Sequence, residues 1–208
     1  MLTLAQLLSS LFAAVLITAT PGPDNLMVLG VGMSRGRWQG IVFGLGCALG
    51  CLSHTVLAVV GVSALIAASP VAFTVLKWLG GAYLVWLGIQ ALRSTGAGRV
   101  AASGAPAQSL RSLFFKGMVA NAINPKVVLF FLSFLPQFVV PAQGQVGWQL
   151  GVLGLVFTAQ AAVLFGLLGY FAGTIGAWLN RRPRAGLWLD RVAGAVFVGL
   201  GLKMIAGR

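Results

Sequence analysis

Long apolar segments dominate the sequence, and charged residues interrupt them only briefly. A helix needs about 20 apolar residues to cross the hydrocarbon layer of a membrane. Six segments meet this requirement: 5–32, 39–67, 71–93, 112–137, 147–178 and 189–206. Only 8% of the 208 residues are charged, and a water-soluble domain of this size could not bury so much apolar surface. The sequence therefore predicts a single-domain (1–208), all-α integral membrane protein with six transmembrane helices.

The positions of Lys and Arg predict the orientation in the membrane. The formal net charge is +12, and most basic residues follow the first, third and fifth segments: Arg35, Arg37, Arg93, Arg99, Arg111, Lys116, Arg181, Arg182, Arg184 and Arg191. Basic loops lie preferentially in the cytoplasm, so both termini are expected to face outward. No stretch places basic and aromatic residues together on a polar face, so the charge does not indicate a nucleic-acid partner.

A polar linker divides the chain into two related halves. The linker, 95–110, is expected to be cytoplasmic and separates a first repeat, 1–94, from a second, 111–208. Residues 192–205 align without gaps on residues 79–92, with five identities: Gly81/Gly194, Ala82/Ala195, Val85/Val198, Leu87/Leu200 and Gly88/Gly201. Because three helices cross the membrane an odd number of times, the second copy must be inverted. Inverted repeats are typical of secondary transporters, whose substrate site lies between the repeats near mid-membrane.

The first apolar segment contains a stretch, "TPGPDNL" (20–26), that should break its helix. Proline lacks an N–H group and clashes with the preceding turn, so Pro21 frees the carbonyl oxygen of Ile17. In lipid such a group is tolerated only where protein or water satisfies it. We expect a second half-helix with Gly22 as its cap and Asp24 in its first turn, where the helix dipole favours a carboxylate. The candidate substrate-binding or coupling residues here are Pro21, Gly22, Pro23, Asp24 and Asn25.

The fourth segment repeats this device in "NAINPK" (121–126). Asn124 is expected to cap a restarted helix, Pro125 to take its first position, and the carbonyl oxygen of Asn121 to lose its helical partner. Lys126 and Asp24 lie about 21 Å and about 14 Å from the expected cytoplasmic ends of their helices. A charge at such depth costs at least about 2.5–3.5 kcal/mol. The pattern predicts a substrate or proton site at the two breaks; the alternative is a structural salt bridge, or charges that extend to the membrane interface.

Five further positions carry chemistry at lower specificity. Cys47, Cys51 and His54 share one helical face and could form a thiolate–imidazole metal site, but acidic ligands are missing and cysteine is common in packed helices. We therefore predict neither a metal nor a cofactor. His54 is a candidate proton relay because it titrates near neutral pH. Tyr83 and Gln160 are weaker candidates, and closely spaced small residues in 36–50 are suited to helix packing within one chain or in a homodimer.

Three motifs resemble those of the LysE/RhtB family of amino-acid exporters: "TPGPDNL" (20–26), "LGGAYLVWLGIQALR" (79–93) and "NPKVVLFFLSFLPQF" (124–138). The resemblance extends over the whole chain in length, helix number and motif order. It implies a bacterial inner-membrane carrier that expels amino acids or derivatives such as lysine, arginine, threonine, homoserine lactone or leucine, driven by the proton gradient. The family often has Asn in place of Asp24, so the resemblance assigns this carboxylate no proton-carrying role.

Together these observations predict an exporter that works by alternating access. A zwitterionic amino acid would bridge the two breaks, with its carboxylate at Lys126 and its ammonium at Asp24, while protons and the lipid bilayer complete the expected partners. A passive small-solute channel and a heavy-metal exporter remain alternatives. An enzyme is not expected, because no Ser/His/Asp set and no aspartate pair occur at a shared depth.

Overall fold

The computed structural model describes residues 2–94 and 108–206, and within these ranges all regular structure is helical. The elements are α1 (Leu4–Ala19), α2 (Pro23–Arg35), α3 (Arg37–Leu57), η1 (Ala58–Val62), α4 (Ser63–Ala68), α5 (Pro70–Leu92), α6 (Leu110–Ala122), α7 (Pro125–Leu129), η2 (Phe130–Phe134), η3 (Leu135–Phe138), η4 (Pro141–Gln143), α8 (Val146–Tyr170), α9 (Ala172–Arg181) and α10 (Pro183–Ala206). Four continuous helices are long and apolar enough to cross a membrane, and two bent pairs raise the number to six. The prediction of an all-α membrane protein is confirmed.

The first and fourth spans are broken where the prolines predicted. The axis bends by 56° between α1 and α2, and by 51° between α6 and the segment that begins at Pro125. Gly22 is the N-cap of α2 and Pro23 its first residue. Asn124 caps α7, and its side-chain oxygen accepts a hydrogen bond of 3.0 Å from the backbone N–H of Lys126. Local proline and cap chemistry therefore places both breaks.

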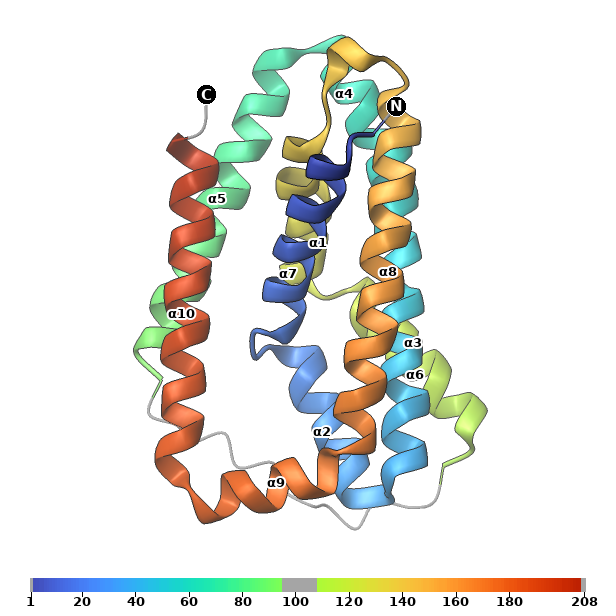
Figure 1. Cartoon of the computed structure of the whole chain (residues 1–208), viewed down its shortest axis with the longest axis vertical. Helices are drawn as coiled ribbons and strands as arrows, with labels where there is room; N and C mark the ends of the chain where they lie inside the picture. The colour runs from blue at the N-terminus through green and yellow to red at the C-terminus, as the bar shows by residue number, and fades with distance from the viewer. Residues whose placement is uncertain (1, 95–107, 207–208) are drawn as a thin grey trace.

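The fifth and sixth spans differ from their predicted bounds. The predicted segment 147–178 is too long, because α8 ends at Tyr170 and the chain turns into the separate helix α9. The sixth helix, α10, starts at Pro183 and not at 189. Figure 1 shows α9 lying across the end of the bundle, between the ends of α8 and α10. Trp178 and Arg181 on α9 are exposed while Ala172 and Gly176 are buried, as expected for an amphipathic helix at a membrane interface.

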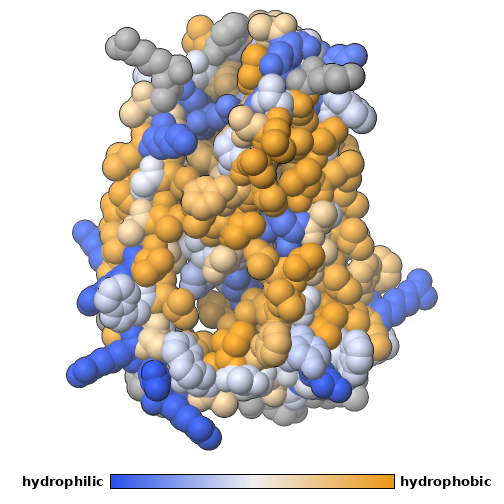
Figure 2. All heavy atoms as spheres, viewed as in Figure 1, coloured by the Kyte–Doolittle hydropathy of each residue, from blue (hydrophilic) through white to orange (hydrophobic). Residues whose placement is uncertain are grey.

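The helices form one elongated bundle with both chain ends at the same end (Figure 1). The turn between α2 and α3 and helix α9 lie at the opposite end, together with the basic residues Arg35, Arg181 and Arg182. Hydrophobic residues cover most of the side of the bundle in Figure 2. Large hydrophobic side chains such as Phe12, Val60 and Val163 are exposed. Such a surface is suited to lipid, not water. Most of the predicted linker, including Arg99, lies outside the described residues.

Close glycine contacts join α5 to α10. A Cβ atom added at Gly88 would lie 2.7 Å from the carbonyl oxygen of Gly194, and one added at Gly194 would lie 2.6 Å from that of Gly88. Gly81 and Gly201 approach each other in the same reciprocal way. The sequence alignment pairs Gly81 with Gly194 and Gly88 with Gly201, so a two-fold axis between inverted repeats would produce this reciprocity. It supports the repeat boundaries, which stay a prediction.

The glycine contacts predict a difference between two substitutions on α10. Gly194→Ala should lower stability by about 1–3 kcal/mol, because the added methyl group meets a backbone carbonyl that cannot move aside. Gly199→Ala should leave stability unchanged or slightly raised, because no atom lies within 4 Å of the added Cβ. Thermal unfolding of both variants in detergent measures the difference, and equal midpoints would contradict the packing.

Candidate functional site

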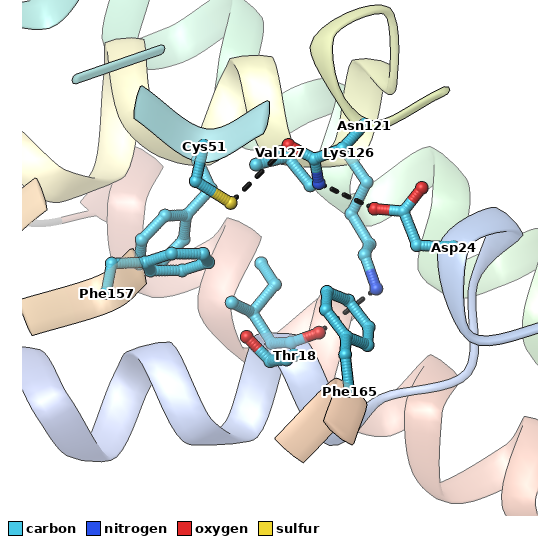
Figure 3. A pocket seen from close by; sticks show the side chains of 10 residues that line it. Thr18, Asp24, Cys51, Asn121, Lys126, Val127, Phe157 and Phe165 are labelled. Atoms are coloured by element: carbon cyan, nitrogen blue, oxygen red, sulfur yellow. Dashed lines mark hydrogen bonds between the residues drawn. The ribbon is translucent and has the colours of Figure 1, made fainter. Parts of the chain in front are cut away.

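The two helix breaks meet at a small closed cavity in the middle of the bundle. Its lining includes Asp24 and Lys126 from the two breaks, with Thr18, Cys51, Asn121 and Phe157 around them (Figure 3). We call this the central cavity. Its volume is about 10 Å³, which is room for roughly one water molecule. The structure thus brings together the charged residues that the sequence singled out, around a space too small for an amino acid.

Lys126 spans from the second break to the first. Its ammonium Nζ donates hydrogen bonds of 3.0 Å to the carbonyl oxygens of Ile17 and Thr20. The Ile17 carbonyl is a group that Pro21 was predicted to free, so the lysine supplies the missing donor. A Cβ atom at position 22 would lie 2.7 Å from Nζ, so Gly22 leaves the space that the ammonium occupies. The ring of Phe197 lies 5.7 Å from Nζ and adds a cation–π contact.

Asp24 is fully buried but only half satisfied. Its exposed fraction is 1%, and its Oδ2 accepts a hydrogen bond of 2.7 Å from the side-chain amide of Asn121. Its Oδ1 has no hydrogen-bond partner in the part of the chain that the structure describes. Within 2–94 and 108–206 the structure records no ion pair between Asp24 and Lys126. The alternative of a structural salt bridge between Asp24 and Lys126 is therefore not observed. Lys126 is only 5% exposed, so it does not extend to the membrane interface either.

The second break is completed by helix α3. The carbonyl oxygen of Asn121 lies 3.1 Å from Nε2 of His54. Because a carbonyl only accepts, Nε2 must carry the hydrogen, and the other ring nitrogen, Nδ1, has no partner. Cys51 Sγ lies 3.4 Å from the side-chain oxygen of Asn121 and donates to it. Asn121 thereby connects the Asp24 carboxylate to Cys51 and His54.

The cysteine and histidine positions do not assemble a metal site among the described residues. Cys47 and Cys51 are free and buried, and the structure shows no group of three or more His, Cys, Asp or Glu side chains there that could hold a metal ion. His54 instead packs against Phe131, with ring centroids 5.6 Å apart. The alternative of a heavy-metal exporter has no ligand set in this part of the chain.

Thr18 connects two predicted residues that the sequence did not link. Its carbonyl oxygen accepts from the amide nitrogen of Asn25 at 2.9 Å, and its hydroxyl accepts from Gln160 at 2.9 Å. Sequence reasoning missed Thr18, although a polar side chain three residues before Pro21 was the available signal. Tyr83 lies on α5, where its ring packs 5.4 Å from that of Trp86, outside the lining of the central cavity.

Four phenylalanine rings pack together beside the central cavity, and we call them the aromatic plug: Phe130 and Phe157, which line the cavity, with Phe131 and Phe134 behind them. Their neighbouring ring centroids are 4.8 to 6.1 Å apart, and each is at most 3% exposed. The π-helical segment η2 carries three of them and runs from the second break toward the end with the chain termini (Figure 1). These rings could not be singled out from the sequence, because a phenylalanine run in an apolar helix carries no distinguishing signal.

The network around Asn121 predicts a stability effect. Asn121→Ala should cost about 1–3 kcal/mol, because the buried Asp24 carboxylate loses the only donor that it has among the described residues. Asn180→Ala on the exposed side of α9 is the matched control and should change little. Urea or thermal unfolding in detergent measures both, and an unchanged Asn121→Ala midpoint would show that this hydrogen bond contributes no stability.

Known proteins similar to this chain include several that are named for efflux. A homoserine/homoserine lactone efflux protein of Salmonella typhimurium is 31% identical over 198 residues, 95% of each chain. An uncharacterized membrane protein of Vibrio cholerae is 33% identical over 203 residues, 97% of each chain, and a leucine efflux protein of Klebsiella pneumoniae is 28% identical over 197 residues, 95% of this chain and 93% of that one. No solved structure matches. The family described as LysE type translocator matches residues 15–208, and the chain belongs to that family.

Proposed function

We propose that this protein is a secondary transporter of the bacterial inner membrane that exports amino acids or close derivatives by proton-coupled alternating access. The relatives named for homoserine and leucine efflux support an amino acid as the substrate. The basic end of the bundle, around α9, would face the cytoplasm and the two termini would face outward. A homodimer remains part of the prediction, without an assigned contact surface.

The observation that carries this proposal is the pair of opposite charges that lie buried at the two breaks and, among the described residues, form no direct ion pair. An unpaired buried charge is costly, so a purely structural role would favour direct pairing. Asp24 retains a carboxylate oxygen without a partner, and Asn124 retains an amide nitrogen without one. A zwitterionic substrate carries a matching group for each break. Its ammonium binds Asp24 at the first break, and its carboxylate binds Lys126 and the N-termini of the half-helices.

The size of the central cavity requires a conformational change. A space of about 10 Å³ holds no amino acid, so the broken helices must separate before substrate binds. The aromatic plug lies between the cavity and the end with the termini, and it must open for release on that side. A protein that opens one side while the other stays closed is a carrier, whereas a passive channel needs a continuous path.

Proton coupling would act through Asp24. Protonation of its carboxylate removes the charge that holds the substrate ammonium, so a proton entering from outside would favour release there and return of the empty carrier. Asn121 transmits the state of Asp24 to the second break, because the same residue binds both Asp24 and His54. His54 is then a positioning residue and not the proton carrier.

The first test replaces the carboxylate. Asp24→Asn keeps the oxygen that faces Asn121 but carries no charge, so it should abolish accumulation driven by a pH gradient. Exchange of labelled for unlabelled substrate should persist at a raised KM, since exchange needs no net proton movement but the ammonium has lost its charged partner. The measurement uses proteoliposomes loaded with L-leucine, L-threonine or L-homoserine. Proton-driven transport at the normal rate would contradict the role of Asp24.

The second test replaces the ammonium. Lys126→Met keeps the length of the side chain but removes the carboxylate-binding charge, so saturable transport should fall at least tenfold. Lys116→Met, at an exposed position of α6, is the control and should transport normally. Unchanged affinity and rate in Lys126→Met would contradict the charge clamp, and flux that does not saturate in the unaltered protein would indicate a channel.

A further inference from the structure

A second and much larger cavity lies on the other side of the α1–α2 break. Its volume is about 600 Å³, within the usual range for small-molecule sites. Its walls come from the break itself, the first turns of α2, the end of α8, α9 and the start of α10. We call it the vestibule. In Figure 2 the surface is hollowed in the lower half of the molecule, toward the end that carries α9.

The break separates the vestibule from the central cavity. Ile17, Thr18 and Asp24 line the central cavity, while Pro21 and Asn25 line the vestibule. Lys126 holds this wall in place through the Ile17 and Thr20 carbonyl groups. The short segment of the break is therefore the wall between a solute in the vestibule and the buried charges. Movement of this segment would connect the two cavities.

One acidic side chain lies in the vestibule wall. The chain has only two acidic residues, Asp24 in the central cavity and Asp190 here. Asp190 Oδ2 accepts a hydrogen bond of 2.6 Å from the hydroxyl of Ser94. The residue is followed directly by Arg191, yet within the described ranges the structure records no ion pair for its carboxylate. A carboxylate that forms no ion pair among the described residues, beside a cavity of this size, is suited to a ligand ammonium.

The remaining wall is largely aliphatic. Leu26, Leu29, Leu168, Ile175, Leu179 and Leu189 all contribute to it. Such a surface favours an apolar side chain on the ligand, since its burial releases water from both surfaces. A second positive charge on the ligand would find no second carboxylate, because Asp24 lies behind the break. The wall therefore selects a neutral amino acid over a basic one.

We propose that the vestibule is a first binding site for a neutral, aliphatic L-amino acid, which docks with its ammonium at Asp190 before it passes the α1–α2 break. This inference rests on the proposed export function and adds a site and a substrate class to it. Asp190 binds and concentrates the substrate at the cytoplasmic end, whereas Asp24 and Lys126 carry it through the closed centre.

Transport kinetics test the role of Asp190. Asp190→Asn keeps an oxygen that accepts from Ser94, so it removes the charge without removing the hydrogen bond that joins Ser94 to α10. In inverted membrane vesicles, which expose the cytoplasmic face, KM for radiolabelled L-leucine should rise at least tenfold while the maximal rate stays within twofold. The control is Arg191→Gln, an exposed neighbour outside the vestibule wall, which should leave KM unchanged.

Cysteine protection gives a second readout that does not depend on transport. Ile175→Cys places a thiol in the vestibule wall, and a positively charged, water-soluble thiol reagent should modify it in purified protein. Millimolar L-leucine, L-valine or L-methionine should slow this modification several-fold, and adding Asp190→Asn should remove the protection. Asn180→Cys on the same helix lies outside the vestibule wall and should not be protected, while the native cysteines are buried.

The two readouts separate this inference from the proposed function. Protection without transport of any amino acid would keep the vestibule site and overturn export. Saturable transport with an unchanged KM in Asp190→Asn, or an absence of protection by all three amino acids, would overturn the vestibule site and leave export standing. An equal rise in KM for Asp190→Asn and Arg191→Gln would also overturn it, because that result reports surface charge alone.

Discussion

The structure depends on how the carbonyl groups released by two prolines are satisfied. Pro21 and Pro125 each remove a helical donor in a region where lipid offers none. Each break is completed from outside its own helix. Lys126, from the second half, donates to carbonyl groups at the end of α1, while His54 on α3 donates to the carbonyl group of Asn121. The first break is thus completed by the second broken span, and the second by α3 together with the backbone N–H of Asn124.

With the breaks completed in this way, the two buried charges form no direct ion pair among the described residues. The protein is also packed differently on the two sides of the breaks. Asp24 is held by the Asn121 amide and Lys126 by carbonyl groups, so among the described residues the two groups form no direct ion pair. The aromatic plug fills the side toward the chain termini, whereas a cavity of about 600 Å³ lies on the side toward α9. The thin part of the barrier is therefore the α1–α2 break, held by one ammonium group. A carrier needs such an element, because a few hydrogen bonds can be exchanged for contacts with a substrate.

Features with local causes were predictable. Gly22 and Asn124 cap restarted helices because a proline follows each of them, and the freed carbonyl of Ile17 follows from the position of Pro21. The end of the fifth span was not marked by charge, since residues 171–178 contain no charged side chain and continue the apolar segment. Only their position across the end of the bundle separates α9 from α8. The vestibule carboxylate, Asp190, was also missed, because in sequence it looks like one more charge in a basic loop.

The sequence by itself determined that the chain crosses a membrane on six apolar segments, that two of them break, and that one charge accompanies each break. These properties arise from composition and from proline geometry, which act within about four residues along the chain. The tertiary structure decided which groups meet. It directed Lys126 to the α1 carbonyl groups and not to Asp24, connected Asn121 to His54, and set Asp190 in the wall of a cavity. Such pairings depend on how closely helices distant in sequence approach, and glycine contacts such as Gly88 with Gly194 set that approach only once the bundle has formed.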